Sequence, residues 1–78
     1  MPWSARLSRP LILRDGRTLR TLADARAFVL ALTPGEQEYQ SWQRAAELLI
    51  EAAEHGGDIE ATTDQVRAAL FMQAMVKL

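Results

Sequence analysis

The Asp15-Gly16 pair is the feature that most constrains how this chain of 78 residues can fold. It lies between two short β-type runs, residues 10–13 and 17–21, and an Asp-Gly pair in that position is typical of a β-hairpin turn. The sequence after residue 21 has the apolar spacing of helices. We therefore predict an α+β domain in which an N-terminal two-stranded hairpin, about residues 10–21, is followed by three α-helices.

The register of the hairpin depends on which face its apolar side chains share. A two-residue loop would pair Ile12 with Leu19 and would place Leu11 and Leu13 on the opposite face. A three-residue loop with Gly16 in the left-handed conformation pairs Leu11 with Leu19 and gathers all three leucines on one face. We predict this bulged turn. The outer face of the hairpin would then carry Ile12, Thr18 and Arg20.

Three helices are predicted, over about residues 22–32, 35–55 and 63–77. Each is preceded by a threonine that can cap it, with a carboxylate or amide three residues later. These pairs are Thr21 with Asp24, Thr33 with Glu36, and Thr62 with Gln65. The polar run that ends at residue 40 weakens the second helix, whose regular part can begin as late as Ser41.

Apolar residues at helical spacing predict the inner faces of these helices. The faces consist of Leu22, Ala25, Phe28, Val29 and Leu32, then Trp42, Ala45, Ala46, Leu49 and Ala53, then Val66, Ala69, Leu70 and Ala74. Tyr39 lies one turn before Trp42, so both aromatic side chains are predicted to be core rather than a ligand cage. Trp3 either folds back over the core or is loose.

The composition restricts the class of protein. The chain has no cysteine, which excludes disulfides and thiolate metal sites, and its apolar share of 49% is ample for a globular core. No apolar run approaches the roughly 18 residues of a membrane span. The N-terminus lacks the pattern of a signal peptide. We therefore expect one cytoplasmic domain over residues 1–78, with no membrane association.

The chain offers little for catalysis or metal binding. His55 is its single histidine, and it is expected in the last turn of a helix, where an imidazolium interacts favourably with the helix dipole. Glu51 and His55 share a helix face, but helical di-metal sites use Glu-x-x-His motifs on two helices. We predict that the protein is not an enzyme and has no catalytic residues, no metal site and no cofactor.

Charge is distributed unevenly along the chain. Residues 1–32 carry six arginines and two aspartates, a net charge of +4, whereas residues 33–78 carry a net charge of −5. Arg14, Arg17 and Arg20 cluster on or beside the hairpin, and a two-stranded ribbon can enter a major groove. A nucleic-acid-binding accessory protein that uses these arginines is therefore an alternative function, although no aromatic residue lies among them to stack a base.

A protein–protein interaction domain that self-associates is the preferred hypothesis. A two-stranded sheet has unpaired edges, and the predicted last helix is apolar around most of its circumference. A symmetric homodimer would cover both and is the partner we expect first, with an unidentified protein partner as the alternative. The residues of this hypothetical interface are Ile12, Phe71, Met72, Met75 and Val76. The opposite interpretation is that the C-terminal turns pack internally on the leucine face of the hairpin. A small-molecule carrier is a third possibility.

Two segments, residues 15–25 and 42–49, are similar in order and type to segments of a group of short proteins from rhizobia and related alphaproteobacteria. The similarity covers roughly residues 3–54, and the motifs that carry it are a turn, a helix cap and core positions. Proteins of that group open with a Trp and Pro segment and a strand pair, and their function is unknown. The resemblance thus implies a bacterial, cytoplasmic domain, and it carries over no activity and no functional residue.

Overall fold

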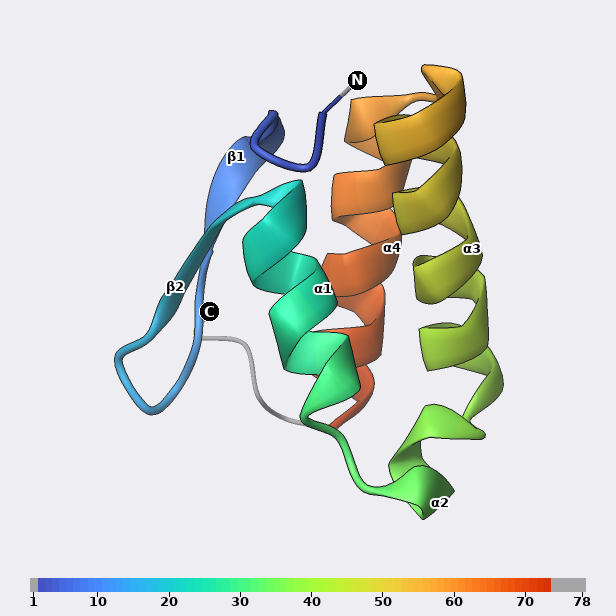
Figure 1. Cartoon of the computed structure of the whole chain (residues 1–78). Coiled ribbons are helices and arrows are strands. Elements are labelled where there is room, and N and C mark those ends of the chain that lie inside the picture. The colour runs from blue at the N-terminus through green and yellow to red at the C-terminus, as the bar shows by residue number, and fades with distance from the viewer. Residues whose placement is uncertain (1, 74–78) are drawn as a thin grey trace.

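A two-stranded antiparallel sheet lies beside a group of helices in the computed structural model, which describes residues 2–73 (Figure 1). The elements are β1 (Arg6–Ile12), β2 (Thr18–Thr21), α1 (Leu22–Leu30), α2 (Pro34–Gln37), α3 (Gln40–His55) and α4 (Ile59–Met72). α3 runs antiparallel to both α1 and α4. The predicted α+β order, hairpin first and helices after it, is confirmed. Within the described part of the chain, no helix has the length and apolar character needed to cross a membrane.

The hairpin has the register that gathers the leucines. Leu11 pairs with Leu19, and the N–H of Leu13 donates to the carbonyl of Arg17 at 2.8 Å. Gly16 has a φ of 93°, as the predicted bulged turn requires. The start of β1 differs from the prediction, because the strand begins at Arg6 rather than at residue 10. An irregularity between Arg6 and Leu11 accommodates Pro10, which has no N–H to donate to a ladder.

The hairpin edges, which the sequence suggested would be unpaired, are partly covered by side chains. On β1, the N–H of Ser8 donates to the hydroxyl of Thr63 on α4 at 3.0 Å, and Arg9 forms an ion pair with Asp64 at 2.8 Å. On β2, the N–H of Arg20 donates to the carboxylate of Asp24 at 2.9 Å. Edge-to-edge pairing with another strand is therefore obstructed on both sides.

The core lies between the hairpin and the helices. Its buried apolar residues are Leu7, Leu11, Leu13, Leu19, Leu22, Ala25, Phe28, Trp42, Ala45, Leu49, Ala52, Ala53, Val66, Ala69 and Leu70. Trp42 is 1% exposed and its ring lies 5.4 Å from that of Phe28, while its indole N–H has no acceptor among residues 2–73. Tyr39, predicted to be core, is 54% exposed. The reason is that α3 begins at Gln40, so Tyr39 precedes the helix and does not follow its phase.

The capping threonines of α1 and α2 behave as predicted. Thr21 with Asp24, and Thr33 with Glu36, each form a complete capping box. The predicted helix over 35–55 is divided, however, because α2 ends after a single turn at Gln37 and α3 starts at Gln40. Half-buried Val29 and Leu32 pack at the edge of the core.

The third predicted cap is wrong. α4 begins at Ile59, four residues earlier than expected, because Asp58 is its N-cap and accepts from the N–H of Ala61 at 3.1 Å. Thr62 lies inside the helix, where it is fully buried and its hydroxyl donates to the carbonyl of Asp58 at 2.8 Å. Ala74 and the predicted end of this helix near residue 77 lie outside the described residues.

The segment before β1 covers the start of α1. The carbonyls of Trp3 and Ala5 accept the N–H groups of Ala23 and Leu22, at 2.8 and 2.9 Å. Together with the Thr21 cap they satisfy the first-turn N–H groups, which have no acceptor within a helix. Trp3 is half-buried and packs against the core, so it folds back and is not loose.

The turn at Gly16 provides a test of the hairpin geometry. We expect Gly16→Ala to lower the free energy of unfolding by about 1–2 kcal/mol, because a side chain disfavours the left-handed backbone even where, as here, space is open. The matched control is Gly35→Ala, which also meets open space but lies in the first turn of α2, so it is expected to be neutral or stabilising. Urea unfolding followed by circular dichroism measures both, and equal losses would contradict the assigned turn.

Candidate functional site

A groove of about 250 Å³ separates α1 from α3. Its floor is apolar and consists of Val29, Leu49 and the small side chain of Ala46. The rims carry Leu30, which is 63% exposed, and Ile50, which is 46% exposed. Large apolar side chains are thus contiguous on this surface, one from each helix, and contiguity distinguishes a docking surface from scattered exposed residues.

One end of this groove is charged. Arg26 of α1 lies there with its guanidinium carbon 5.2 Å from the centre of the Trp3 ring, an arrangement that favours a cation–π interaction. Glu54 of α3 lines the same groove. In the part of the chain described, neither Arg26 nor Glu54 forms an ion pair.

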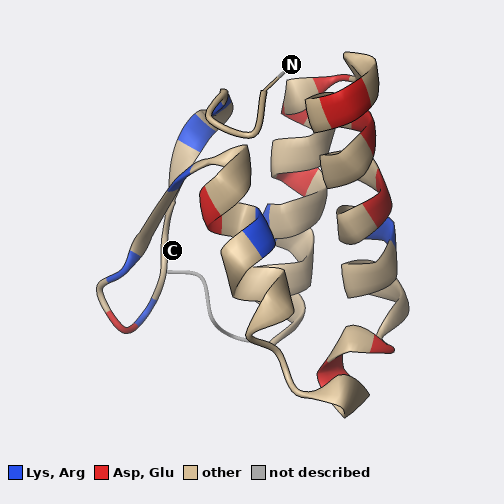
Figure 2. Cartoon of the chain, viewed as in Figure 1, with Lys and Arg blue, Asp and Glu red and all other residues tan. Residues whose placement is uncertain are grey.

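The acidic and basic residues remain segregated in the folded chain. Most of the basic residues lie along the hairpin, with a few on the helices, whereas the acidic residues lie mainly on α3, α4 and α2 (Figure 2). Arg17 of the hairpin contacts two side chains within the fold. Its side chain donates to the Asp15 carboxylate at 2.7 Å, and its guanidinium carbon lies 5.5 Å from the centre of the Phe28 ring. The backbone N–H and side chain of Arg17 lower the pKa of Asp15. Arg14, Arg17 and Arg20 are all exposed.

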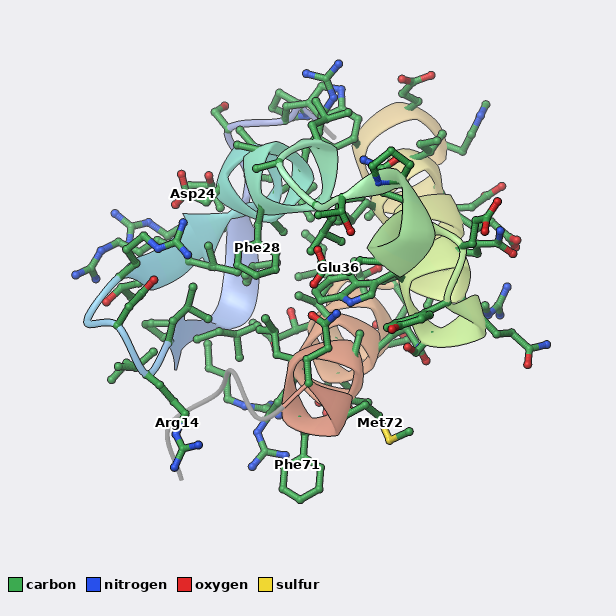
Figure 3. All side chains as sticks on the ribbon, turned by 90° about the horizontal axis from the view of Figure 1, so that it is seen from below. Arg14, Asp24, Phe28, Glu36, Phe71 and Met72 are labelled. Atoms are coloured by element: carbon green, nitrogen blue, oxygen red, sulfur yellow. The ribbon has the colours of Figure 1, made fainter. Side chains whose placement is uncertain are left out.

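The residues predicted for an interface are exposed wherever the structure describes them. Ile12 is 50%, Phe71 54% and Met72 77% exposed. Phe71 and Met72 nevertheless leave α4 in different directions, so they do not share one face of that helix (Figure 3). Met75 and Val76 lie outside the described residues.

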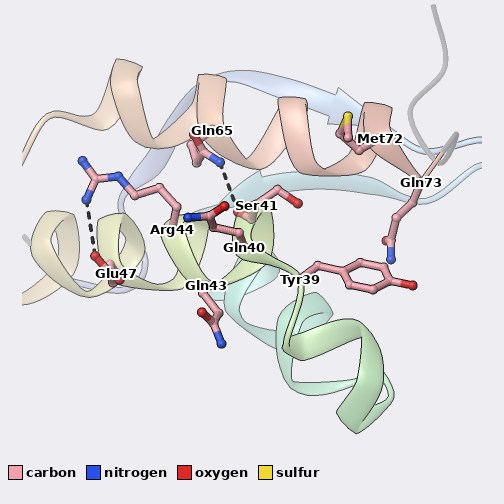
Figure 4. Close-up of a pocket in the computed structure, with 9 residues that line it drawn as sticks. All are labelled: Tyr39, Gln40, Ser41, Gln43, Arg44, Glu47, Gln65, Met72 and Gln73. Carbon is pink, nitrogen blue, oxygen red and sulfur yellow. Dashed lines mark hydrogen bonds and ion pairs between the residues drawn. The ribbon is translucent and has the colours of Figure 1, made fainter.

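An open groove of about 750 Å³ lies between the N-terminal half of α3 and α4 (Figure 4). Its lining is rich in amides and consists of Tyr39, Gln40, Ser41, Gln43, Arg44, Glu47, Gln65, Met72 and Gln73. Several of these polar groups bond to one another. The amide of Gln65 donates to the carbonyl of Ser41 at 3.1 Å, and Arg44 pairs with Glu47 at 3.3 Å. The side chains that line this groove are thus mainly polar, and some of them are engaged with one another.

His55 lies where the sequence predicted it, in the last turn of α3, and it is exposed. The helix ends at Gly56, whose φ of 68° is typical of a glycine C-cap. Across residues 2–73, no cluster of three or more His, Cys, Asp or Glu side chains is placed to hold a metal ion.

Glu36 joins the short helix α2 to the end of α4. Its carboxylate accepts from the N–H of Thr33 at 2.9 Å and from the side-chain amide of Gln73 at 3.2 Å. The hydrogen bond from the backbone of Thr33, the largest influence, lowers the pKa of Glu36, and the Gln73 amide lowers it further. Figure 3 shows Glu36 between α1 and α4, and Glu36 and Phe28 line the same cavity.

Comparisons of the chain with protein-family models, with curated proteins and with solved structures found no match. The resemblance to short alphaproteobacterial proteins therefore stays a prediction.

The carboxylate of Glu36 should make stability depend on pH. Because its pKa is lower in the folded chain than in the unfolded chain, it stabilises the fold at neutral pH, and this contribution is lost as the pH falls from about 5 through the folded-state pKa. We expect Glu36→Gln to be less stable than the wild type at neutral pH, with a difference that narrows in acid. Unfolding curves at several pH values measure this difference.

The matched control is Glu38→Gln, which removes a carboxylate at the end of the same short helix without removing a capping bond. We expect this variant to differ less from the wild type at every pH. A Glu36→Gln difference that stays constant into strong acid would contradict the role of the Glu36 carboxylate.

Proposed function

We propose that the protein is a non-enzymatic interaction domain that acts in the cytoplasm by self-association as a homodimer. The single observation that carries this proposal is the apolar groove between α1 and α3, with Leu30 and Ile50 exposed on its rims. The fold has a complete core without covering these side chains, so a second surface is needed to remove them from water. Symmetric dimers are the commonest assemblies that do so.

Ile12, Phe71 and Met72 form a second set of exposed apolar residues that could serve the same function. Their exposure supports this possibility, whereas the different directions of Phe71 and Met72 favour the groove. The covered strand edges of the hairpin also favour association through helices rather than through added strands.

Self-association can be measured directly as the mass in solution. We expect light scattering behind size exclusion to give a mass that rises from monomer to dimer as the protein concentration increases from micromolar to near-millimolar. High salt should preserve the dimer, because burial of apolar surface drives it. A monomer mass throughout this range would refute self-association.

Nucleic-acid binding is the second candidate function, and the collection of basic residues on the hairpin is the observation that favours it (Figure 2). Arg14, Arg17 and Arg20, which are all exposed, are the arginines of the proposed contact. Contacts of this kind are made with phosphates and are therefore sensitive to salt.

This second function predicts that a short DNA or RNA probe binds at low salt and dissociates steeply as salt rises, as measured by fluorescence anisotropy. Exchange of Arg14 and Arg20 for glutamate should abolish that binding. Arg44→Glu is the control, since Arg44 lies on α3 and pairs with Glu47. Absence of binding at low salt would exclude nucleic acid as the ligand.

A further inference from the structure

We propose that two copies of the chain dock groove to groove about a two-fold axis parallel to α1 and α3, so that Arg26 of each copy faces Glu54 of the other. This inference rests on the proposed self-association and specifies its geometry. It also gives Arg26 and Glu54 the role of setting the alignment of the two copies.

The direction of the two helices favours this axis. α1 and α3 line the groove side by side and run antiparallel (Figure 1). A two-fold axis along the groove exchanges its two sides but keeps its two ends in place, so α1 of one copy lies over α3 of the partner subunit. Each helix is then antiparallel to the helix it covers, as in an up-and-down four-helix bundle.

The spacing of four residues supports one particular alignment. Arg26 and Leu30 are four residues apart on α1, and Ile50 and Glu54 are four residues apart on α3. Each pair spans about 6 Å along its helix. Because the covering helices are antiparallel, an alignment that brings Arg26 to Glu54 of the partner subunit also brings Leu30 to Ile50 of the partner subunit. Because the axis leaves the height of each residue along the groove unchanged, this match requires only that Arg26 and Glu54 lie at the same end of the groove within one copy.

The opposite choice of axis is unfavourable. A two-fold axis perpendicular to the groove would turn the end that carries Arg26 and Glu54 onto the Leu30 end of the partner subunit. Both charged groups would then be removed from water against apolar side chains without a partner of opposite charge, and burial of an unpaired charge is costly. Neither group has an ion-pair partner among the residues described, so each is available for a contact between copies.

The extent of the groove is also relevant. A typical stable interface buries about 800 Å² on each partner, which is about a sixth of the 4798 Å² surface of this chain. The surfaces of α1 and α3 that flank the groove must therefore take part in the contact together with the groove itself.

The apolar contact is tested by a pair of glutamates on each candidate surface. We expect Leu30→Glu with Ile50→Glu to raise the dimer dissociation constant by about 100-fold or more, as loss of central apolar contacts does. The matched control is Phe71→Glu with Met72→Glu, which adds the same charge at side chains of comparable exposure and should change the constant by less than about threefold. Circular dichroism and urea unfolding establish that each variant is folded.

The alignment is tested by charge reversal. Arg26→Glu and Glu54→Arg should each weaken the dimer about tenfold, because each places like charges against one another. The double variant that carries both changes should return to within about threefold of the wild type. Loss of the Arg26 contact with Trp3 cannot explain such a rescue, because the double variant lacks that contact too.

The outcomes separate this inference from the function on which it rests. A wild-type chain that stays monomeric overturns both. In a second outcome, the dimer is dissociated by Phe71→Glu with Met72→Glu and left intact by the groove variants. That result overturns the groove as the interface, while self-association stands. Failure of the double charge reversal to rescue dimerisation overturns the inferred axis.

Discussion

Burial of a single leucine face on the hairpin is the constraint on which the rest of the structure depends. A two-stranded sheet is marginal in water by itself, and this one presents Leu7, Leu11, Leu13 and Leu19 on the side that meets the helices. The bulged turn at Gly16 sets the register that keeps these side chains together. A shift of one residue would turn them toward solvent and leave α1 and α4 without a surface to pack against.

The groove lies between two helices of unequal length. α1 has 9 residues and α3 has 16, so α3 extends beyond the neighbour that covers it. The chain before β1 compensates at one end, where Trp3 packs on the core and its carbonyl caps α1. Neither α1 nor the segment before β1 covers the floor of the groove around Ala46, which stays open to solvent. α1 thus has two different faces, with Leu22, Ala25 and Phe28 buried in the core and Leu30 exposed.

Local chemistry made much of the fold predictable from sequence. The register, two of the capping boxes, the burial of Trp42 and the glycine stop after His55 each depend on a few neighbouring residues. The start of α4 could not be predicted in this way, because Asp58 and Thr62 are both suitable caps. The choice depends on the packing of Thr62 against α3, where its hydroxyl lies 3.2 Å from the carbonyl of Leu48. The groove could not be predicted from the sequence either, because it results from how α1 and α3 pack against each other.

The attachment of the first strand to the last helix has a consequence for synthesis of the chain. The contacts from Ser8 to Thr63 and from Arg9 to Asp64 each join residues 55 positions apart. A nascent chain therefore cannot complete its sheet–helix packing until α4 has left the ribosome, whereas the hairpin and α1 emerge early. During that interval the leucine face lacks its covering, and it is then an exposed apolar surface that a chaperone could bind.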